Sequence, residues 1–326
     1  MESELVPVTN GNLLLSGRVA VPVVVARAGD RASERFLEFF TATIRNKNTR
    51  AAYAHAVSQF FLWCESNGFA LETLRPVVVA TYIELLQGSH SAPTVKQHLA
   101  AIRMLFDWLV TGQVIAMNPA ASVRGPKYVV KKGKTPVLSA EEARRLLDSI
   151  DTSTLTGLRD RALIAVMVYS FARVSAVVNM DVADYWQNGK RWWLRLHEKG
   201  GKFHEVPTHH NAEEYLDAYI HTAGIGTDCK SPLFRTSRGR TGALTANRMS
   251  RKDAWHMIKR RVRAAGLSSR VNCHTWRATG ITAYLANDGE LENAQLIAAH
   301  ESPRTTKLYD RTGDDITLDE IERIVI

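Results

Sequence analysis

Apolar residues recur at helical spacing through the first third of the chain. The pattern begins near Phe36 and continues through the segments 51–64 and 71–86. A fourth segment, 94–110, carries one apolar stripe at i, i+3 and i+4 spacing, made of Leu99, Ile102, Leu105, Phe106 and Leu109. A helix with such a stripe is stable when the stripe is buried against a partner. The pattern therefore predicts a compact all-helical domain over residues 31–123.

Two segments flank this predicted domain. Residues 1–30 show no sustained period, so we expect an extended amino-terminal arm there. Residues 124–136 combine Gly and Pro with basic side chains and contain no acidic residue. Helix breakers together with charge predict an interdomain linker. Its lysines either lie along DNA phosphates as a basic strap or belong to a solvated connection, and the linker alone favours neither interpretation.

A second domain is expected over residues 137–326. Ser139 and Glu142 have the spacing of a capping box, which predicts a helix start. Short strands are predicted within 191–206, on either side of a Gly-Gly turn. Further helices are predicted over 159–169, 212–221, 246–265, 274–286 and 291–299, and a last short one from Thr317. The expected fold class is mainly α (α+β), with an all-helical first domain and a mostly helical second domain that contains a small antiparallel sheet.

The charge balance adds a candidate partner. The 326 residues carry a formal net charge of +9, and the sequence pI is about 9.5. A basic excess of this size suits a polyanion such as nucleic acid, although many basic proteins bind none. The three cysteines are widely spaced and suggest neither a disulfide framework nor a metal site. The acidic start Met1-Glu2-Ser3-Glu4 is unlike a secretory signal, and no segment predicts a membrane span, so we expect a cytoplasmic protein.

Four short segments carry residues suited to phosphate chemistry. They are Ala172-Arg173-Val174-Ser175, His197-Glu198-Lys199-Gly200-Gly201-Lys202, His274-Thr275-Trp276-Arg277, and Ala299-His300 followed nine residues later by Tyr309. In this order and at these spacings they resemble the tyrosine recombinase family, which includes the Xer recombinases, lambda-type phage integrases and Cre. The resemblance spans roughly residues 31–326. It implies a helical core-binding domain followed by a catalytic domain.

The resemblance also implies a catalytic set, which consists of Arg173, Lys199, His274, Arg277, His300 and Tyr309. Phosphodiester transfer places extra negative charge on the non-bridging oxygens, and preorganised donors aimed at that charge lower the barrier. Arg173 and Arg277 suit this role because a guanidinium group stays charged and binds phosphate bidentately. Tyr309 is the expected nucleophile, which would form a 3′-phosphotyrosine.

Proton transfer falls to the remaining members of the set. A free tyrosine phenol has a pKa of about 10, so the nucleophile needs a base or electrostatic help. His274 is the expected base, and His300 is expected to hydrogen bond to the phosphate or to the tyrosine. The resemblance implies that Lys199 protonates the leaving 5′-oxygen, and Lys202 remains its rival. No metal or other cofactor is expected.

The chain departs from the family pattern near the first arginine. Family members commonly carry an acid three residues after it, and this chain has Ala176 there, which leaves Arg173 without its usual partner. The usual Leu-Gly-His before the nucleophile is Ala298-Ala299-His300. Trp276 replaces a leucine within the His-x-x-Arg motif. None of these changes removes a reacting group.

Basic side chains away from the reacting groups predict DNA contacts. Several of them crowd the predicted helix 246–265, where one sign of charge dominates. The predicted contacts are Lys96, Arg103, Lys127, Lys131, Lys132, Lys202, Arg248, Arg251, Lys259 and Arg260. A solvated face is the alternative for such a charge run. With contacts in both domains, the chain would form a clamp around double-stranded DNA.

We therefore expect a site-specific DNA recombinase, the integrase of a mobile element, that acts through a 3′-phosphotyrosine and a Holliday junction. The apolar tail, Ile316 to Ile326, is expected to dock on a neighbouring protomer within a tetramer on DNA, with packing in cis as the alternative. A type IB topoisomerase would share the chemistry but act as a monomer. A catalytically inactive DNA-binding regulator would need a lost reacting group. The expected location is the bacterial cytoplasm, at the nucleoid.

Overall fold

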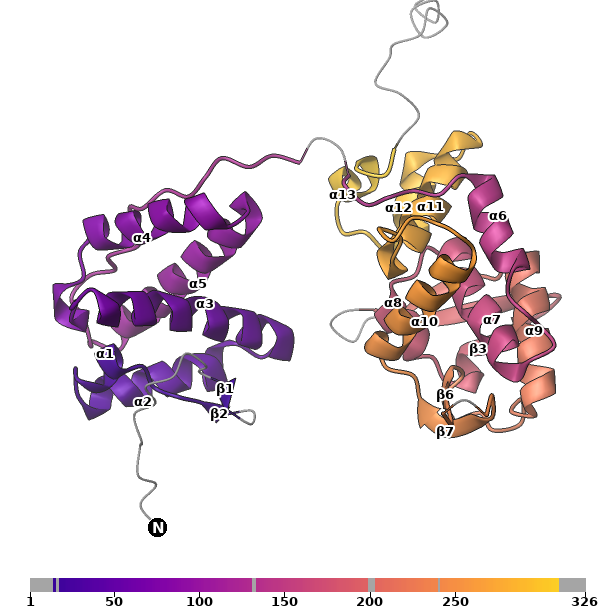
Figure 1. The fold of residues 1–326 in the computed structure, drawn as a ribbon, viewed down its shortest axis with the longest axis horizontal. Coiled ribbons are helices and arrows are strands. Elements are labelled where there is room, and N and C mark those ends of the chain that lie inside the picture. The colour runs from indigo at the N-terminus through magenta and orange to yellow at the C-terminus, as the bar shows by residue number, and fades with distance from the viewer. Residues whose placement is uncertain (1–13, 16–17, 131–132, 199–202, 240, 311–326) are drawn as a thin grey trace, which may run out of the picture. The chain divides into compact units, whose positions relative to one another are not determined.

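The computed structural model describes residues 14–15, 18–130, 133–198, 203–239 and 241–310. The chain divides into two compact units, Met1–Val129 and Val130–Ile326 (Figure 1). This division falls inside the segment that was predicted as a linker. Within the described parts of the chain, no helix is both long and apolar enough to cross a membrane.

The first unit is built almost entirely from helices. Its elements are β1 (Leu14–Leu15), β2 (Arg18–Val19), α1 (Val23–Ala26), α2 (Asp30–Glu38), a π-helical turn (Phe39–Thr43), α3 (Lys47–Ser66), a 3₁₀ turn (Leu71–Thr73), α4 (Pro76–Ser89) and α5 (Ala92–Thr111). The Asn46 side chain caps α3 by accepting from the backbone N–H groups of Asn48 and Thr49. Helices α3 and α5 pack together, and their Phe60 and Phe106 rings meet edge to face in the core.

Two sequence predictions for the first unit need correction. The predicted arm ends too late, because Val21, Val24 and Val25 are buried in the core. The four-residue helix α1 is too short to produce a sustained period, so the sequence pattern missed it. The helix predicted from residue 71 begins instead at Pro76, because the residue before a proline is pushed into extended backbone.

The second unit is mainly helical with small antiparallel sheets, which confirms the predicted fold class. Its elements are α6 (Ala140–Asp148), α7 (Leu155–Tyr169), α8 (Val174–Val178), a 3₁₀ turn (Val182–Asp184), β3 (Tyr185–Asn188), β4 (Arg191–His197), β5 (Phe203–Pro207), α9 (His210–Ala223), β6 (Arg235–Ser237), β7 (Leu244–Arg248), α10 (Arg251–Ala264), α11 (Cys273–Ala286), α12 (Leu291–Ile297) and α13 (Pro303–Lys307). The predicted helix from Thr317 lies outside the described residues.

Helix α7 forms the centre of the second unit. Nearly every residue from Gly157 to Met167 is buried, and the helix packs against α9 and α11 (Figure 1). Gly280 permits the close approach of α11, since a Cβ atom there would lie 2.1 Å from the carbonyl oxygen of Val168. This contact matters for the chemistry because α11 carries two residues of the predicted catalytic set.

The predicted strands form a three-stranded antiparallel sheet in the order β3-β4-β5. Leu194 lies opposite Tyr185 on one side and Val206 on the other, and all three are buried. Strand β4 ends at His197, directly opposite Phe203 at the start of β5. The chain between them contains Glu198 and the four residues of the predicted turn. The sheet therefore fixes the positions of the two strand ends that flank this segment.

The helix predicted over 246–265 is wrong at its amino-terminal end. Residues 244–248 form β7, which pairs with β6, and α10 begins only at Arg251. Ser250 and Asp253 form the capping box that sets this start, because each side chain accepts from the backbone N–H of the other residue. Arg248 consequently lies on a strand and not on the basic helix.

Candidate active site

Tyr309 lies just after α13 and is nearly buried, with 7% of its surface exposed. Its phenol oxygen is 2.7 Å from Nε2 of His274. Two hydrogen bonds fix the backbone around Tyr309. The Tyr309 carbonyl oxygen accepts from the Thr282 hydroxyl at 2.8 Å, and the carbonyl oxygen of Leu308 accepts from the Gly133 amide at 3.1 Å. The predicted nucleophile and base are therefore in hydrogen-bonding contact.

His274 lies in the first turn of α11, where the Asn272 side chain accepts from its backbone N–H. Desolvation, together with the charges of Arg277 and Arg173, lowers the pKa of His274 below its usual value. The imidazole is thus neutral at pH 7, and a neutral ring can accept the phenol proton at Nε2. The geometry and the charge state both suit the predicted role of a base.

His300 lies behind the nucleophile. Its ring stacks on the Tyr309 ring at 5.7 Å between centroids and 11° between planes, and its Nδ1 is 2.9 Å from the hydroxyl of buried Thr306. Desolvation and the neighbouring arginines lower the pKa of His300 to about 3. The hydrogen bonds of the described residues include none between His300 and Tyr309, and the alternative, a hydrogen bond from His300 to the phosphate, stays a prediction. In this structure His300 supports the Tyr309 ring by stacking.

Arg277 is almost completely buried, with 1% of its surface exposed. Its Nη1 donates to the carbonyl oxygen of Phe171, and its Nη2 donates to that of Ala298 at 2.6 Å. Its Nε is buried and has no hydrogen-bond partner among the described residues. Desolvation and the charge of Arg173 lower its pKa to about 10, so it remains charged at neutral pH. A guanidinium group has five N–H donors, so these two carbonyls leave donors for a phosphate, and the expected bidentate contact stays a prediction.

Two backbone positions that supply or adjoin these carbonyls are strained. Phe171 has φ of 53° and Ala299 has φ of 47°, both in the left-handed region that side chains other than glycine avoid. Such strain persists where the surrounding structure enforces it, often at functional sites. The glycine usual in the family at the position of Ala299 suits this conformation, which gives the earlier sequence departure a structural meaning.

Arg173 lies at the amino-terminal end of α8 and has a carboxylate partner. Its Nη1 donates to Oε2 of Glu198 at 2.6 Å, and the arginine side chain is 39% exposed while that of Glu198 is 9% exposed. The usual acid at position 176 is absent, as the sequence shows, but another carboxylate takes a place beside Arg173. The partner comes from the end of β4, 25 residues along the chain, and nothing in the local sequence around Arg173 indicates it.

The basic hairpin between β4 and β5 holds the two candidates for the general acid. Lys199 and Lys202 lie outside the described residues, as do Lys131 and Lys132 of the linker. The assignment of Lys199 as the acid, with Lys202 as its rival, therefore stays a prediction.

A hollow of about 590 Å³ connects the reacting groups to the basic helix α10. Arg173, His274 and Arg277 line one part of it. The α10 side chains that line it are Arg251, Lys252, Trp255 and Lys259. A phosphate bound at the catalytic arginines would thus lie beside further cations, as an extended polyanion requires. We call this hollow the catalytic basin.

Some of the predicted DNA contacts have structural hydrogen-bond partners, and one of these, Arg260, is nevertheless 59% exposed. Lys96, Lys127 and Arg251 are exposed to solvent. Four others donate hydrogen bonds within the protein, to partners that lie too far along the chain for a sequence pattern to indicate. Arg103 donates to the carbonyl oxygens of Ala120 and Val123, and Lys259 to those of Ser269 and Val271. Arg248 donates to the carbonyl oxygens of Val178 and Met180 and to Asp181, and Arg260 donates to Asp160.

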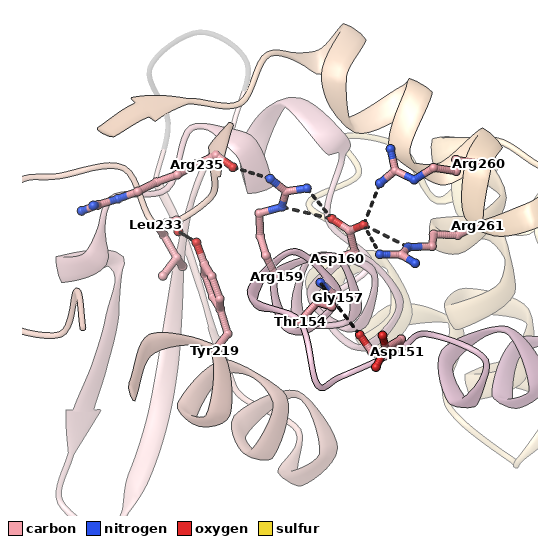
Figure 2. Close-up of polar contacts among 10 residues, drawn as sticks. All are labelled: Asp151, Thr154, Gly157, Arg159, Asp160, Tyr219, Leu233, Arg235, Arg260 and Arg261. Carbon is pink, nitrogen blue, oxygen red and sulfur yellow. Dashed lines mark hydrogen bonds and ion pairs between the residues drawn. The ribbon is translucent and has the colours of Figure 1, made fainter. Parts of the chain in front are cut away.

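Asp160 is the centre of an acid–arginine cluster that sequence analysis missed (Figure 2). The residue is 0% exposed. Its Oδ1 accepts from Arg159, at 2.6 and 3.0 Å, and its Oδ2 accepts from Arg260 and Arg261 at 2.7 to 3.0 Å. Arg159 also donates to the carbonyl oxygen of Arg235 in β6 at 2.7 Å. The cluster therefore fastens α10, the basic wall of the catalytic basin, to α7.

A tyrosine phenol in contact with a histidine, close to two arginines, is an arrangement suited to attack on a phosphate through tyrosine. Residues 136–314 match the model of the phage integrase family, and residues 33–115 match the phage integrase N-terminal SAM-like domain. The chain therefore belongs to the phage integrase family, and the resemblance to tyrosine recombinases is confirmed.

Individual relatives agree with this assignment. Tyrosine recombinase XerC of Chlamydia muridarum is 31% identical over 70% of this chain and 69% of its own length. Tyrosine recombinase XerD of Ralstonia nicotianae is 27% identical over 81% and 83%. Two solved structures share the fold with a TM-score of 0.66: XerH site-specific recombinase bound to difH substrate (16% identity, 92% and 94% covered) and a lambda integrase tetramer bound to a Holliday junction (17% identity, 93% and 86% covered).

Proposed function

We propose that this chain is a site-specific DNA recombinase that cuts and rejoins double-stranded DNA through a 3′-phosphotyrosine at Tyr309. The observation that carries the proposal is the 2.7 Å contact between the Tyr309 phenol and Nε2 of His274, next to Arg173 and Arg277. A scissile phosphate enters the catalytic basin, where the exposed face of Arg173 and Nε of Arg277 meet its non-bridging oxygens. These charges stabilise the transition state more than the ground state.

The cleavage step follows from the same contacts. His274 accepts the phenol proton while the Tyr309 oxygen bonds to phosphorus, and the bond from phosphorus to the 5′-oxygen breaks. Lys199, or in its place Lys202, gives a proton to that 5′-oxygen. The phosphotyrosine keeps the energy of the phosphodiester, so a 5′-hydroxyl of a second strand can reverse the reaction and form a Holliday junction.

The assembly on DNA is the second part of the proposal. Both units hold DNA as a clamp, with Lys96, Lys127 and Arg251 among the phosphate contacts. The tail, Ile316 to Ile326, docks on the neighbouring protomer and so builds a tetramer. The lambda integrase tetramer on a Holliday junction is a related assembly that supports this arrangement. We place the protein in the bacterial cytoplasm at the nucleoid, as the integrase of a mobile element.

A suicide substrate tests the central claim. A DNA site with a nick next to the cleavage point traps the covalent adduct, because the short leaving strand diffuses away. Wild-type protein should accumulate the adduct, Tyr309→Phe should give none, and Tyr215→Phe, outside the basin, should behave like wild type. An adduct that survives Tyr309→Phe, or a wild-type protein that forms none on its own site, contradicts the proposal.

The general acid is tested with a 5′-bridging phosphorothiolate, whose sulfur leaves without a proton. The alanine variant of the true acid should cleave normal DNA slowly and the sulfur substrate at nearly the wild-type rate. We expect this rescue for Lys199→Ala and not for Lys202→Ala. Rescue of Lys202→Ala alone would assign the role to the rival.

Deletion of the chain after Thr312 tests the tail. The shortened protein should still bind a single half-site, because the proposed phosphate contacts remain. Cooperative binding to paired sites should weaken, as measured by gel shift over a range of protein concentrations. Unchanged cooperativity would favour packing of the tail in cis.

A further inference from the structure

The catalytic basin gathers positive charge with little to balance it. Arg173 and Arg277 lie close enough for the charge of Arg173 to lower the pKa of Arg277. The described residues that line the basin include no carboxylate, and Ala176 offers none beside Arg173. Without an acid nearby, a long and partly exposed arginine such as Arg173 would be free to turn away from the phosphate position.

Glu198 lies next to the basin and supplies the missing charge. Its Oε2 accepts from Nη1 of Arg173 at 2.6 Å, and only 9% of its side chain is exposed. Its negative charge also acts on Arg277, whose pKa it raises against the opposing effect of Arg173. One carboxylate therefore balances both guanidinium groups, although it is not itself part of the basin wall.

The position of Glu198 on the chain fixes its carboxylate. The residue directly follows β4, whose last residue, His197, is paired with Phe203 of β5. The sheet thus holds the backbone on the near side of Glu198 in register. Glu198 also directly precedes Lys199 in the sequence. The residue that contacts Arg173 is therefore the neighbour of the candidate general acid.

We propose that Glu198 is a positioning residue, which orients Arg173 toward the scissile phosphate and takes over the role of the acid that is absent at position 176. The proposal rests on the proposed function. Because Glu198 accepts from Nη1 alone, Nε and Nη2 of Arg173 can donate to phosphate. Fixed donors lower the barrier because no reorientation is needed during the reaction.

A cleavage assay on suicide DNA at saturating protein separates positioning from binding. Glu198→Ala should slow single-turnover adduct formation about 10²-fold, the usual effect of a misplaced catalytic group. Its Kd for DNA should stay the same or fall, because a negative charge near the phosphate site is removed. Glu205→Ala is the matched control, since Glu205 forms an exposed ion pair with Arg195 in the same sheet, and it should cleave like wild type.

A double-mutant cycle with Arg173→Ala shows whether Glu198 acts through the arginine. In the Arg173→Ala background, Glu198→Ala should change the rate less than about twofold, because acting through the arginine makes the two effects non-additive. Thermal unfolding of every variant shows whether it is folded. If Glu198→Ala does not fold, the isosteric variant Glu198→Gln takes its place.

Three results would overturn the inference. One is cleavage by Glu198→Ala at or above the wild-type rate, which would mean that the carboxylate only withholds Arg173 from DNA. Another is an equal loss in the Arg173→Ala background. The third is a loss explained by weaker DNA binding. A control reaction with the wild-type protein is run beside these variants. If it forms no Tyr309-dependent adduct, the proposed function itself is overturned, and this inference with it.

Discussion

Two of the acid–arginine contacts in the second unit, one at Asp160 and one at Glu198, differ in their access to solvent. Asp160 is fully buried, and both of its oxygens are occupied by Arg159, Arg260 and Arg261 (Figure 2). Glu198 binds one edge of Arg173, whose side chain remains 39% exposed and faces the catalytic basin. The same chemical pairing therefore serves two purposes. A saturated acid holds helices together, whereas a partly used arginine keeps donors for a ligand.

The largest effect is expected at the saturated cluster. Asp160→Ala leaves three guanidinium groups around an empty site, one of them on buried Arg159. Breaking a buried ion pair in this way should lower the free energy of unfolding by about 3–5 kcal/mol, measured by denaturant titration. Asp228→Ala removes an exposed partner of Arg235 and should cost less than about 1 kcal/mol. Similar losses of unfolding free energy in Asp160→Ala and Asp228→Ala would mean that the buried cluster at Asp160 is no more stabilising than an exposed ion pair.

The two arginines that we propose as catalytic should lose cleavage alike when replaced but should differ in their effect on stability. Arg173→Ala should reduce adduct formation about 10²–10³-fold, with DNA binding and unfolding nearly unchanged. Arg277→Ala should lose cleavage to a similar extent and should also unfold more easily, because two buried carbonyls lose their donors. Single-turnover kinetics and thermal unfolding give both readouts. Loss of DNA binding in step with cleavage would mean that these residues only position the DNA.

The pH dependence of cleavage should reflect the neutral base in the basin. Because the pKa of His274 lies below its usual value of 6.5, the ring should remain able to accept a proton at pH 6.5. Adduct formation should therefore fall only at more acidic pH, as the ring becomes protonated. A His221→Gln control, in α9, should keep the wild-type profile. An acid limb centred at or above pH 6.5 would count against His274 as the base.

The smallest effect is expected at the strained backbone. Ala299→Gly should raise the free energy of unfolding by about 0.5–1 kcal/mol, since relief of the left-handed strain outweighs the added freedom of the unfolded chain. Ala283→Gly, in the exposed interior of α11, should lower it by about 1 kcal/mol. Effects of the same sign at both positions would show that residue 299 is not strained.

The candidate reacting groups could be picked out of the sequence because each one lies in a short local motif, and their roles stay predictions. The apolar stripe of residues 94–110 predicted α5, and the strongly apolar segment 159–169 predicted most of α7. Sequence patterns could not indicate contacts between residues that lie far apart along the chain. Glu198 approaches Arg173 from another element, and the carbonyls that hold Arg277 come from Phe171 and Ala298. Strands β6 and β7 were missed because their residues are largely polar, so no alternating pattern marks them.

The hydrogen bond from the Gly133 amide to the Leu308 carbonyl links the start of the second unit to the residue before Tyr309. Gly133 belongs to the segment that leads from one unit to the other. Any pull on this segment must either break the bond or move Leu308, and with it the backbone of Tyr309. A displacement of this segment would therefore reach the backbone of Tyr309 through one hydrogen bond, apart from the residues that line the catalytic basin.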